Sequence, residues 1–154
     1  MTLGQLISRT RSHTRDLSGT VFTNQHIQDF INEGINRIRM VIPELRAMPL
    51  LYSGNETVKL LPLEYQHLIA LYSSSRCFFQ DDRFFQATTY MNEFEVKLDE
   101  MKSRLHSGDL VILGEDGNAV TFKYFDETVN LKPYWGVDED PEFPSDFFDV
   151  PTEE

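Results

Sequence analysis

Residues 22–45 read FTNQHIQDFINEGINRIRMVIPEL, and this stretch decides the fold class. Thr23 stands where an N-cap residue belongs, and Phe22 before it can pack on Ile27 as a hydrophobic staple. Pro43 lacks the N–H that a continuing helix needs, so it should end or bend the helix. The apolar residues recur at steps of three and four, as in an amphipathic α-helix: Ile27, Phe30, Ile31, Gly34, Ile35, Ile38, Val41, Ile42 and Leu45.

A shorter helix is predicted before this one. Thr2 and Gln5 have the spacing of a capping box, ahead of the apolar residues Leu3, Leu6 and Ile7. This helix should end near the turn at residues 16–19. Its three arginines are expected to face outward, namely Arg9, Arg11 and Arg15.

Two further helices are predicted after residue 60. Pro62 suits the start of the third helix, whose buried stripe should be Tyr65, Leu68, Ile69, Tyr72 and Phe79. Three serines at residues 73–75 would let a neighbouring helix approach closely. The fourth helix has an a/d pattern over three heptads, formed by Phe84, Ala87, Met91, Phe94, Leu98, Met101 and Leu105.

The fourth helix is expected to be the spine of the body, because it buries one continuous face. Gly108 is a typical residue at the end of a helix. Two charge pairs are expected on its exposed side in the favourable i,i+4 order, Glu93 with Lys97 and Glu100 with Arg104. The connection to the third helix is so short that the two must be antiparallel, which indicates a helical bundle.

Turn residues predict two β-hairpins outside the helices. The first spans residues 50–60 around the turn at 53–56, and the second spans residues 110–125 around the turn at 115–118. The predicted fold is therefore mainly α, a small bundle of about four helices with short β-hairpins and an extended acidic C-terminal arm. Residues 1–107 form the helical body, and residues 108–154 form the second hairpin and the arm.

The arm carries the charge of the chain. The net charge is −11, yet residues 1–107 hold twelve acids and twelve Lys or Arg, whereas residues 108–154 hold thirteen acids and two lysines. Acidic tails are usually poor in aromatic residues, and this one is rich in them. We favour docking on another subunit or partner over folding back onto the bundle, through Tyr134, Trp135, Phe143, Phe147 and Phe148.

The sequence shows no pattern typical of an enzyme or a metal site. The four histidines lie on separate predicted elements, and Cys77 is the only cysteine, expected to be a buried thiol. No phosphate-binding loop or nucleophile elbow is present. We therefore expect no catalytic residue, no cofactor and no metal. Without a long apolar run or a signal peptide, the chain is expected to avoid membranes and to be made in a cytoplasm.

The order of elements resembles the head-tail adaptor (connector) proteins of tailed bacteriophages. The resemblance covers about residues 2–105 and depends on residues 22–38, on the segment ending LLPLEY at 60–65, and on the paired helices through YMNEFE at 90–95. It implies a ring of about twelve subunits between the portal protein and a downstream tail or stopper protein. In the virion such a ring extends the channel, through which DNA passes without specific binding.

A second class of function remains open from the residues alone. The carboxylates of the arm could occupy a basic groove on a host protein, as in an acidic inhibitor or DNA mimic. That function needs a rigid array of acids, whereas the densest acids here lie among Pro133, Pro141, Pro144 and Pro151. A small hydrolase would need catalytic groups that the sequence lacks.

Overall fold

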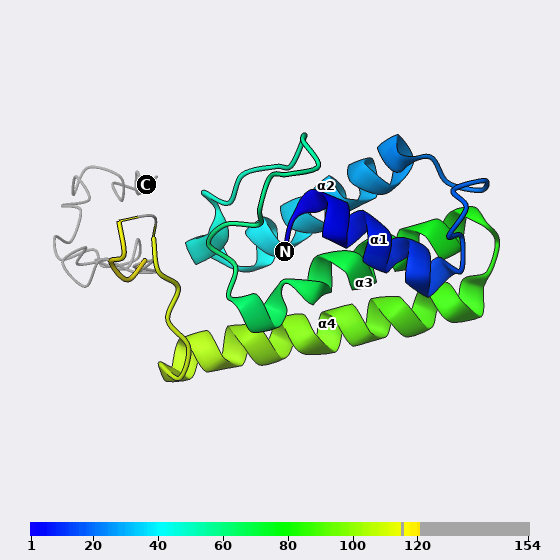
Figure 1. The fold of residues 1–154 in the computed structure, drawn as a ribbon. Coiled ribbons are helices and arrows are strands. Elements are labelled where there is room, and N and C mark those ends of the chain that lie inside the picture. Colours follow the sequence, from blue (N-terminus) through cyan, green and yellow to red (C-terminus); the bar gives the residue numbers. More distant parts are fainter. Residues whose placement is uncertain (115, 121–154) are drawn as a thin grey trace, which may run out of the picture. The chain divides into compact units, whose positions relative to one another are not determined.

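The computed structural model describes residues 1–114 and 116–120, and it is mainly helical (Figure 1). In that part of the chain the α-helices are α1 (Leu3–Thr14), α2 (Asn24–Val41), α3 (His67–Gln80) and α4 (Phe84–Ser107). Two 3-10 turns, Pro43–Leu45 and Leu63–Tyr65, follow α2 and precede α3. The predicted helical bundle is confirmed. The arm residues Tyr134, Trp135, Phe143, Phe147 and Phe148 lie outside the described residues.

The predicted ends of α1, α2 and α4 are confirmed, whereas α3 begins at His67 and not at Pro62, which instead precedes the 3-10 turn Leu63–Tyr65. Thr2 and Gln5 form the capping box of α1, and the Thr23 hydroxyl accepts the His26 backbone N–H at 3.2 Å as the N-cap of α2. Helix α2 ends at Val41, just before Pro43, and α4 ends at Ser107 with Gly108 as its C-cap at φ +80°. Positive φ is a conformation that glycine adopts without the steric cost of a Cβ atom.

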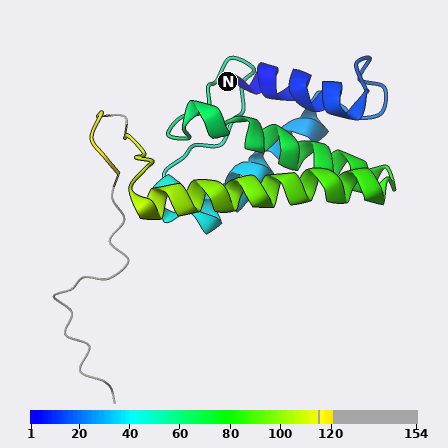
Figure 2. The same ribbon diagram turned by 90° about the horizontal axis from the view of Figure 1, so that it is seen from below.

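Helix α3, not α4, lies at the centre of the bundle. It packs against each of the other three α-helices, and Figure 2 shows α1 and α4 flanking it. Ser73, Ser74 and Ser75 are fully buried, so small side chains do let the neighbouring helices approach closely. The a/d stripe of α4 covers one side of α3, because Ala87, Phe94, Leu98 and Met101 are fully buried. The longer periodic pattern of α4 favours it as the spine, because a sequence pattern shows one buried face more clearly than burial on every side.

The first predicted hairpin is wrong. Residues 46–62 form an irregular loop whose carbonyl groups face the start of α1. The Leu3 N–H donates to Glu56 O at 2.9 Å, and the Gly4 N–H donates to Gly54 O at 3.0 Å. The first N–H groups of a helix have no partner inside it, and here the loop supplies those partners. Meanwhile Leu51, Val58 and Leu61 turn into the core, which anchors the loop.

The second predicted hairpin is present only as a tight turn. Leu113 and Ala119 form an isolated antiparallel bridge, and the Val120 N–H donates to Ile112 O at 2.8 Å. The described residues contain no extended strand in this segment, and residues 121–125 lie outside them. Ile112 is fully buried in the same apolar core as the helices, so the chain after α4 returns to the body.

The two i,i+4 charge pairs predicted on α4 are replaced by other contacts. Lys97 Nζ lies 2.7 Å from Glu100 Oε2, one residue closer in sequence than expected. Arg104 Nη1 lies 2.9 Å from Glu64 Oε1, so this arginine ties α4 to the turn before α3. Arg104 also donates to the Tyr65 hydroxyl at 2.9 Å. Arg104 thus contacts the buried Tyr65 as well as Glu64.

Candidate functional site

The polar network at the α1–α2 connection shapes one end of the bundle. Arg11 Nη1 lies 3.1 Å from Asp16 Oδ2, and Nη2 donates at 2.8 Å to Phe22 O and at 2.8 Å to Asn24 Oδ1. The expectation that Arg11 faces outward is therefore wrong, although Arg9 and Arg15 are exposed. The pattern of a short helix could not show this, because the partners of Arg11 lie beyond the helix end.

Asp16 is the acidic residue of this network. Its carboxylate accepts the backbone N–H groups of Phe22 at 2.9 Å and Thr20 at 3.0 Å. Burial alone would raise the pKa of Asp16, but these N–H groups, that of Val21 and the Arg11 guanidinium together hold it below its ordinary value. Gly19 is required here, because its φ is +69° and a Cβ atom would lie 2.9 Å from Arg11 Nη1.

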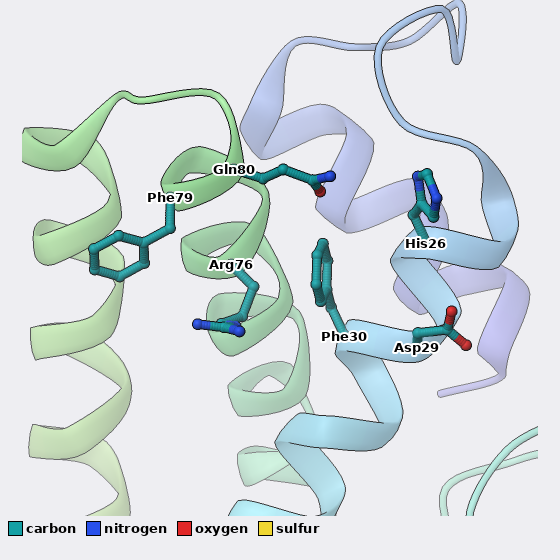
Figure 3. Close-up of a pocket in the computed structure, with 6 residues that line it drawn as sticks. All are labelled: His26, Asp29, Phe30, Arg76, Phe79 and Gln80. Carbon is teal, nitrogen blue, oxygen red and sulfur yellow. The ribbon is translucent and has the colours of Figure 1, made fainter.

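A groove opens beside this network, between the N-terminal half of α2 and the C-terminal half of α3 (Figure 3). Its volume is about 510 Å³, and its lining residues are His26, Asp29, Phe30, Arg76, Phe79 and Gln80. The Arg76 guanidinium carbon lies 5.8 Å from the centre of the Phe30 ring, and Nε lies 3.2 Å from Glu33 Oε2. The groove thus combines aromatic walls with an arginine, a setting that suits an apolar or aromatic side chain of a partner.

Close packing of α2 on α3 positions this groove. Gly34 is buried, and a Cβ atom there would lie 3.1 Å from Tyr72 Cδ1, so only glycine allows this approach without displacing the ring. The Tyr72 hydroxyl donates to Glu33 Oε1 at 2.9 Å, and its ring contacts Phe94 edge to face at 5.2 Å between centroids. Burial, followed by the bond to Glu33, raises the pKa of Tyr72 to about 12. Tyr72 therefore stays a neutral donor at physiological pH and holds Glu33 against Arg76.

Exposed apolar side chains gather at the same end of the bundle. The α1–α2 connection and the α3–α4 connection lie together there in both ribbon views (Figures 1 and 2). Leu17 and Val21 on the first connection are exposed, as are Phe84 and Phe85 at the start of α4. Phe84, expected to begin the buried stripe, is 58% exposed, and its ring meets the Phe79 ring edge to face with centroids 6.2 Å apart. The stripe begins at Ala87 instead, since the helix extends beyond the core at this end.

Phe85 and Val96 are surface residues that the sequence interpretation did not single out. They are 82% and 66% exposed on α4. The sequence could have indicated their exposure. Both lie on the helix face opposite the a/d positions, where charged side chains are usual.

His13, which is partly buried, contacts the fully buried Ser74. His13 Nδ1 lies 2.9 Å from Ser74 Oγ, and the His13 ring stacks on Tyr90 at 5.2 Å. Because the Ser74 hydroxyl donates to Ala70 O at 2.6 Å, the imidazole Nδ1 must donate to Ser74. Burial, followed by Arg9, lowers the pKa of His13. Since Ser74 is fully buried, no substrate could reach its hydroxyl in this fold.

Cys77 is buried as expected, and burial raises the pKa of its thiol to about 12. A thiol with that pKa is not a nucleophile at neutral pH. Among the described residues, no three His, Cys, Asp or Glu side chains come together in a way that could hold a metal ion. None of the helices in the same residues has the length and apolar character needed to cross a bilayer.

The groove and the exposed apolar residues are two features of the described residues that could bind another molecule. Comparison of the chain with protein-family models, with curated proteins and with solved structures finds no match.

Proposed function

We propose that this chain is a structural virion protein of a tailed bacteriophage, a head-tail adaptor that forms a ring of about twelve subunits between the portal and the tail. The resemblance over residues 2–105 is the basis of this proposal, together with the surfaces of the helical body. The ring extends the DNA channel, and it acts by assembly rather than by catalysis, so it needs no cofactor.

The observation that carries the proposal is the distribution of exposed apolar side chains. A closed ring repeats one heterologous contact, so each subunit must offer two different surfaces. Among its exposed large apolar residues, the described body has two groups that are far apart along its helices. Phe84 and Phe85 lie at the start of α4, whereas Met40 lies near the end of α2 and Leu63 lies in the turn before α3. In a monomer these apolar side chains stay in water and add no stability, whereas the subunit contacts of a ring would bury them.

The charge distribution suits the wall of a channel through which DNA must pass without being retained. The helical body has as many acids as Lys and Arg, and the excess of acids lies in residues 108–154. A wall without excess positive charge does not retain the phosphate backbone. The acidic arm, through Tyr134, Trp135, Phe143, Phe147 and Phe148, would grip the portal, a neighbouring subunit or the tail or stopper protein.

Native mass spectrometry of the full chain, alone and with a candidate portal protein, tests this function. The expected result is a closed complex of about twelve copies of the 17.9-kDa chain, formed alone or on the portal. Particle averaging of the same sample should show a ring with an open centre. A chain that stays monomeric with portal and instead binds one basic protein tightly would favour the acidic inhibitor.

A further inference from the structure

A second groove lies beyond the C-terminal ends of α2 and α4, and its volume is about 380 Å³. Ala47 and Pro49 line it after α2, Leu60 lines it from the loop before α3, and Val120 lines it after α4. Because these four residues are apolar and come from three separate segments, tertiary packing creates a site that suits an apolar side chain.

The backbone holds Leu60 at the wall of this groove. Its φ is +66°, and the Leu61 N–H donates to Lys59 O at 2.8 Å across it. A bulky residue in this left-handed region is strained, and it stays there only where its neighbours fix the backbone. Val58 and Leu61 are buried in the core on either side and supply that restraint.

The described chain ends at the same groove. Val120 is the last described residue, and its N–H donates at 2.8 Å to the carbonyl of the fully buried Ile112, so its position is tied to the body. Residues 121–125 follow and read TFKYF. Two residues of chain span at most about 7 Å, so the Phe122 Cα lies within that distance of the Val120 Cα. In an extended chain, residues two apart point to the same side.

We propose that Phe122 fills this groove and packs on Leu60 and Ala47 of its own chain. The contact fixes the point at which residues 126–154, the acidic part of the arm, leave the body. It goes beyond the proposed ring, because it forms inside one subunit and needs no second copy.

Proximity favours Phe122 over an apolar side chain of another molecule. One residue joins it to Val120, and a group on so short a linker has an effective concentration in the millimolar range or above. A second copy or a portal protein would have to displace it from the groove.

Charge favours Phe122 over the aromatic residues further along the arm. Glu44 and Lys59 also line the groove and carry one charge of each sign, so the site does not attract an acidic segment. Residues 119–125 contain no acid, whereas Phe143 and Phe147 stand next to Glu142 and Asp146. An apolar groove without net charge suits the first segment better.

Melting of the full chain, followed by circular dichroism, tests the contact. Phe122→Ala should lower the melting temperature of the body by about 5 °C or more, because a large apolar side chain returns to water. Phe125→Ala is the matched control, since it removes the same atoms three residues away, on the other side of an extended chain. Its melting temperature should stay within about 1 °C of the original.

A double substitution makes the test specific to the groove. Phe122→Ala should lower the melting temperature less than half as much when Leu60→Ala is already present, because the two side chains contact each other. The shift should also be the same at two protein concentrations tenfold apart, since the contact lies within one chain.

Three outcomes would overturn the inference. An unchanged melting temperature for Phe122→Ala would show that the groove does not hold this side chain. Additive effects of Phe122→Ala and Leu60→Ala would show that Phe122 packs elsewhere. A shift that changes with concentration would show that the groove takes Phe122 from a second copy. Native mass spectrometry of the same samples reads the proposed ring separately, so failure of the ring leaves this contact in place, and the converse holds too.

Discussion

Arg11 and Asp16 form an ion pair that is almost closed to solvent. Arg11 Nη1 lies 3.1 Å from Asp16 Oδ2, and the two side chains are 13% and 4% exposed. The pair closes the α1–α2 connection, because both residues also bond backbone groups of the turn. The turn also carries the exposed Leu17 and Val21, so a contact inside the fold holds part of the exposed apolar surface in place.

Arg11→Met should therefore destabilise the body by about 3–5 kcal/mol, because it leaves the Asp16 carboxylate buried without its cation. Urea denaturation followed by circular dichroism measures this loss. Arg9→Met is the matched control and should change the free energy of unfolding by less than about 0.5 kcal/mol, since Arg9 is exposed. Equal effects of the two substitutions would show that the Arg11 network contributes no stability.

Stability should fall in two steps as the pH decreases. The pKa of His13 is lowered from 6.5 in the folded state, so the unfolded chain binds the proton more readily and folding weakens as the pH falls below about 6.5. The pKa of Asp16 is lowered from 3.8, so its contribution is lost as the pH falls below about 3.8. Denaturation midpoints between pH 7.5 and 5 should drop less for His13→Phe than for the original chain. Parallel curves would exclude His13 as the group responsible.

Gly34→Ala should destabilise the bundle by about 1–3 kcal/mol through overpacking against Tyr72. Alanine favours a helix by up to about 1 kcal/mol over glycine, so the sign of the effect depends on whether the Tyr72 ring can move. Its contacts with Glu33 and Phe94 hold it in place. A double-mutant cycle with Tyr72→Leu checks this, because Gly34→Ala should become stabilising once the ring is absent. A stabilising effect in the original background would mean that the ring moves freely.

Phe94→Ala should cost about 3–5 kcal/mol, because Phe94 is fully buried and its removal leaves a cavity between α3 and α4. Val96→Ala, two residues away on the exposed side, is the control and should leave the melting temperature within about 1 °C of the original. An unchanged melting temperature for Phe94→Ala would show that the buried stripe of α4 had been misassigned.

Removal of residues 136–154 should leave the helical body folded and weaken only assembly. We expect Trp135→Ala to show part of the same loss, because in the proposed function each aromatic residue of the arm would fill a pocket on a partner. Circular dichroism beside a ring-assembly or portal-binding measurement separates the two effects. If truncation melts the body, the aromatic residues belong to its core; if assembly is unchanged, the arm is a solvated tail.

The sequence by itself determined the helices of this protein and most of their ends. The period of three to four residues is visible in 22–45 and 84–105, and caps such as Thr2, Thr23 and Gly108 depend on neighbours only a few residues away. Local interactions of this kind are encoded in local sequence. The small serines of α3 were likewise recognised as a place for close packing.

Only the tertiary structure decided where the polar partners and the exposed surfaces lie. Turn residues at 53–56 predict a hairpin, yet the free N–H groups at the start of α1, fifty residues away, take the carbonyl groups of that loop. Arg11 is buried by residues beyond the end of its helix, and Arg104 bonds Glu64 rather than Glu100. Phe84 is exposed because α4 extends past the core that its pattern predicts. These outcomes depend on residues outside the element that carries the pattern, so no local pattern can identify them.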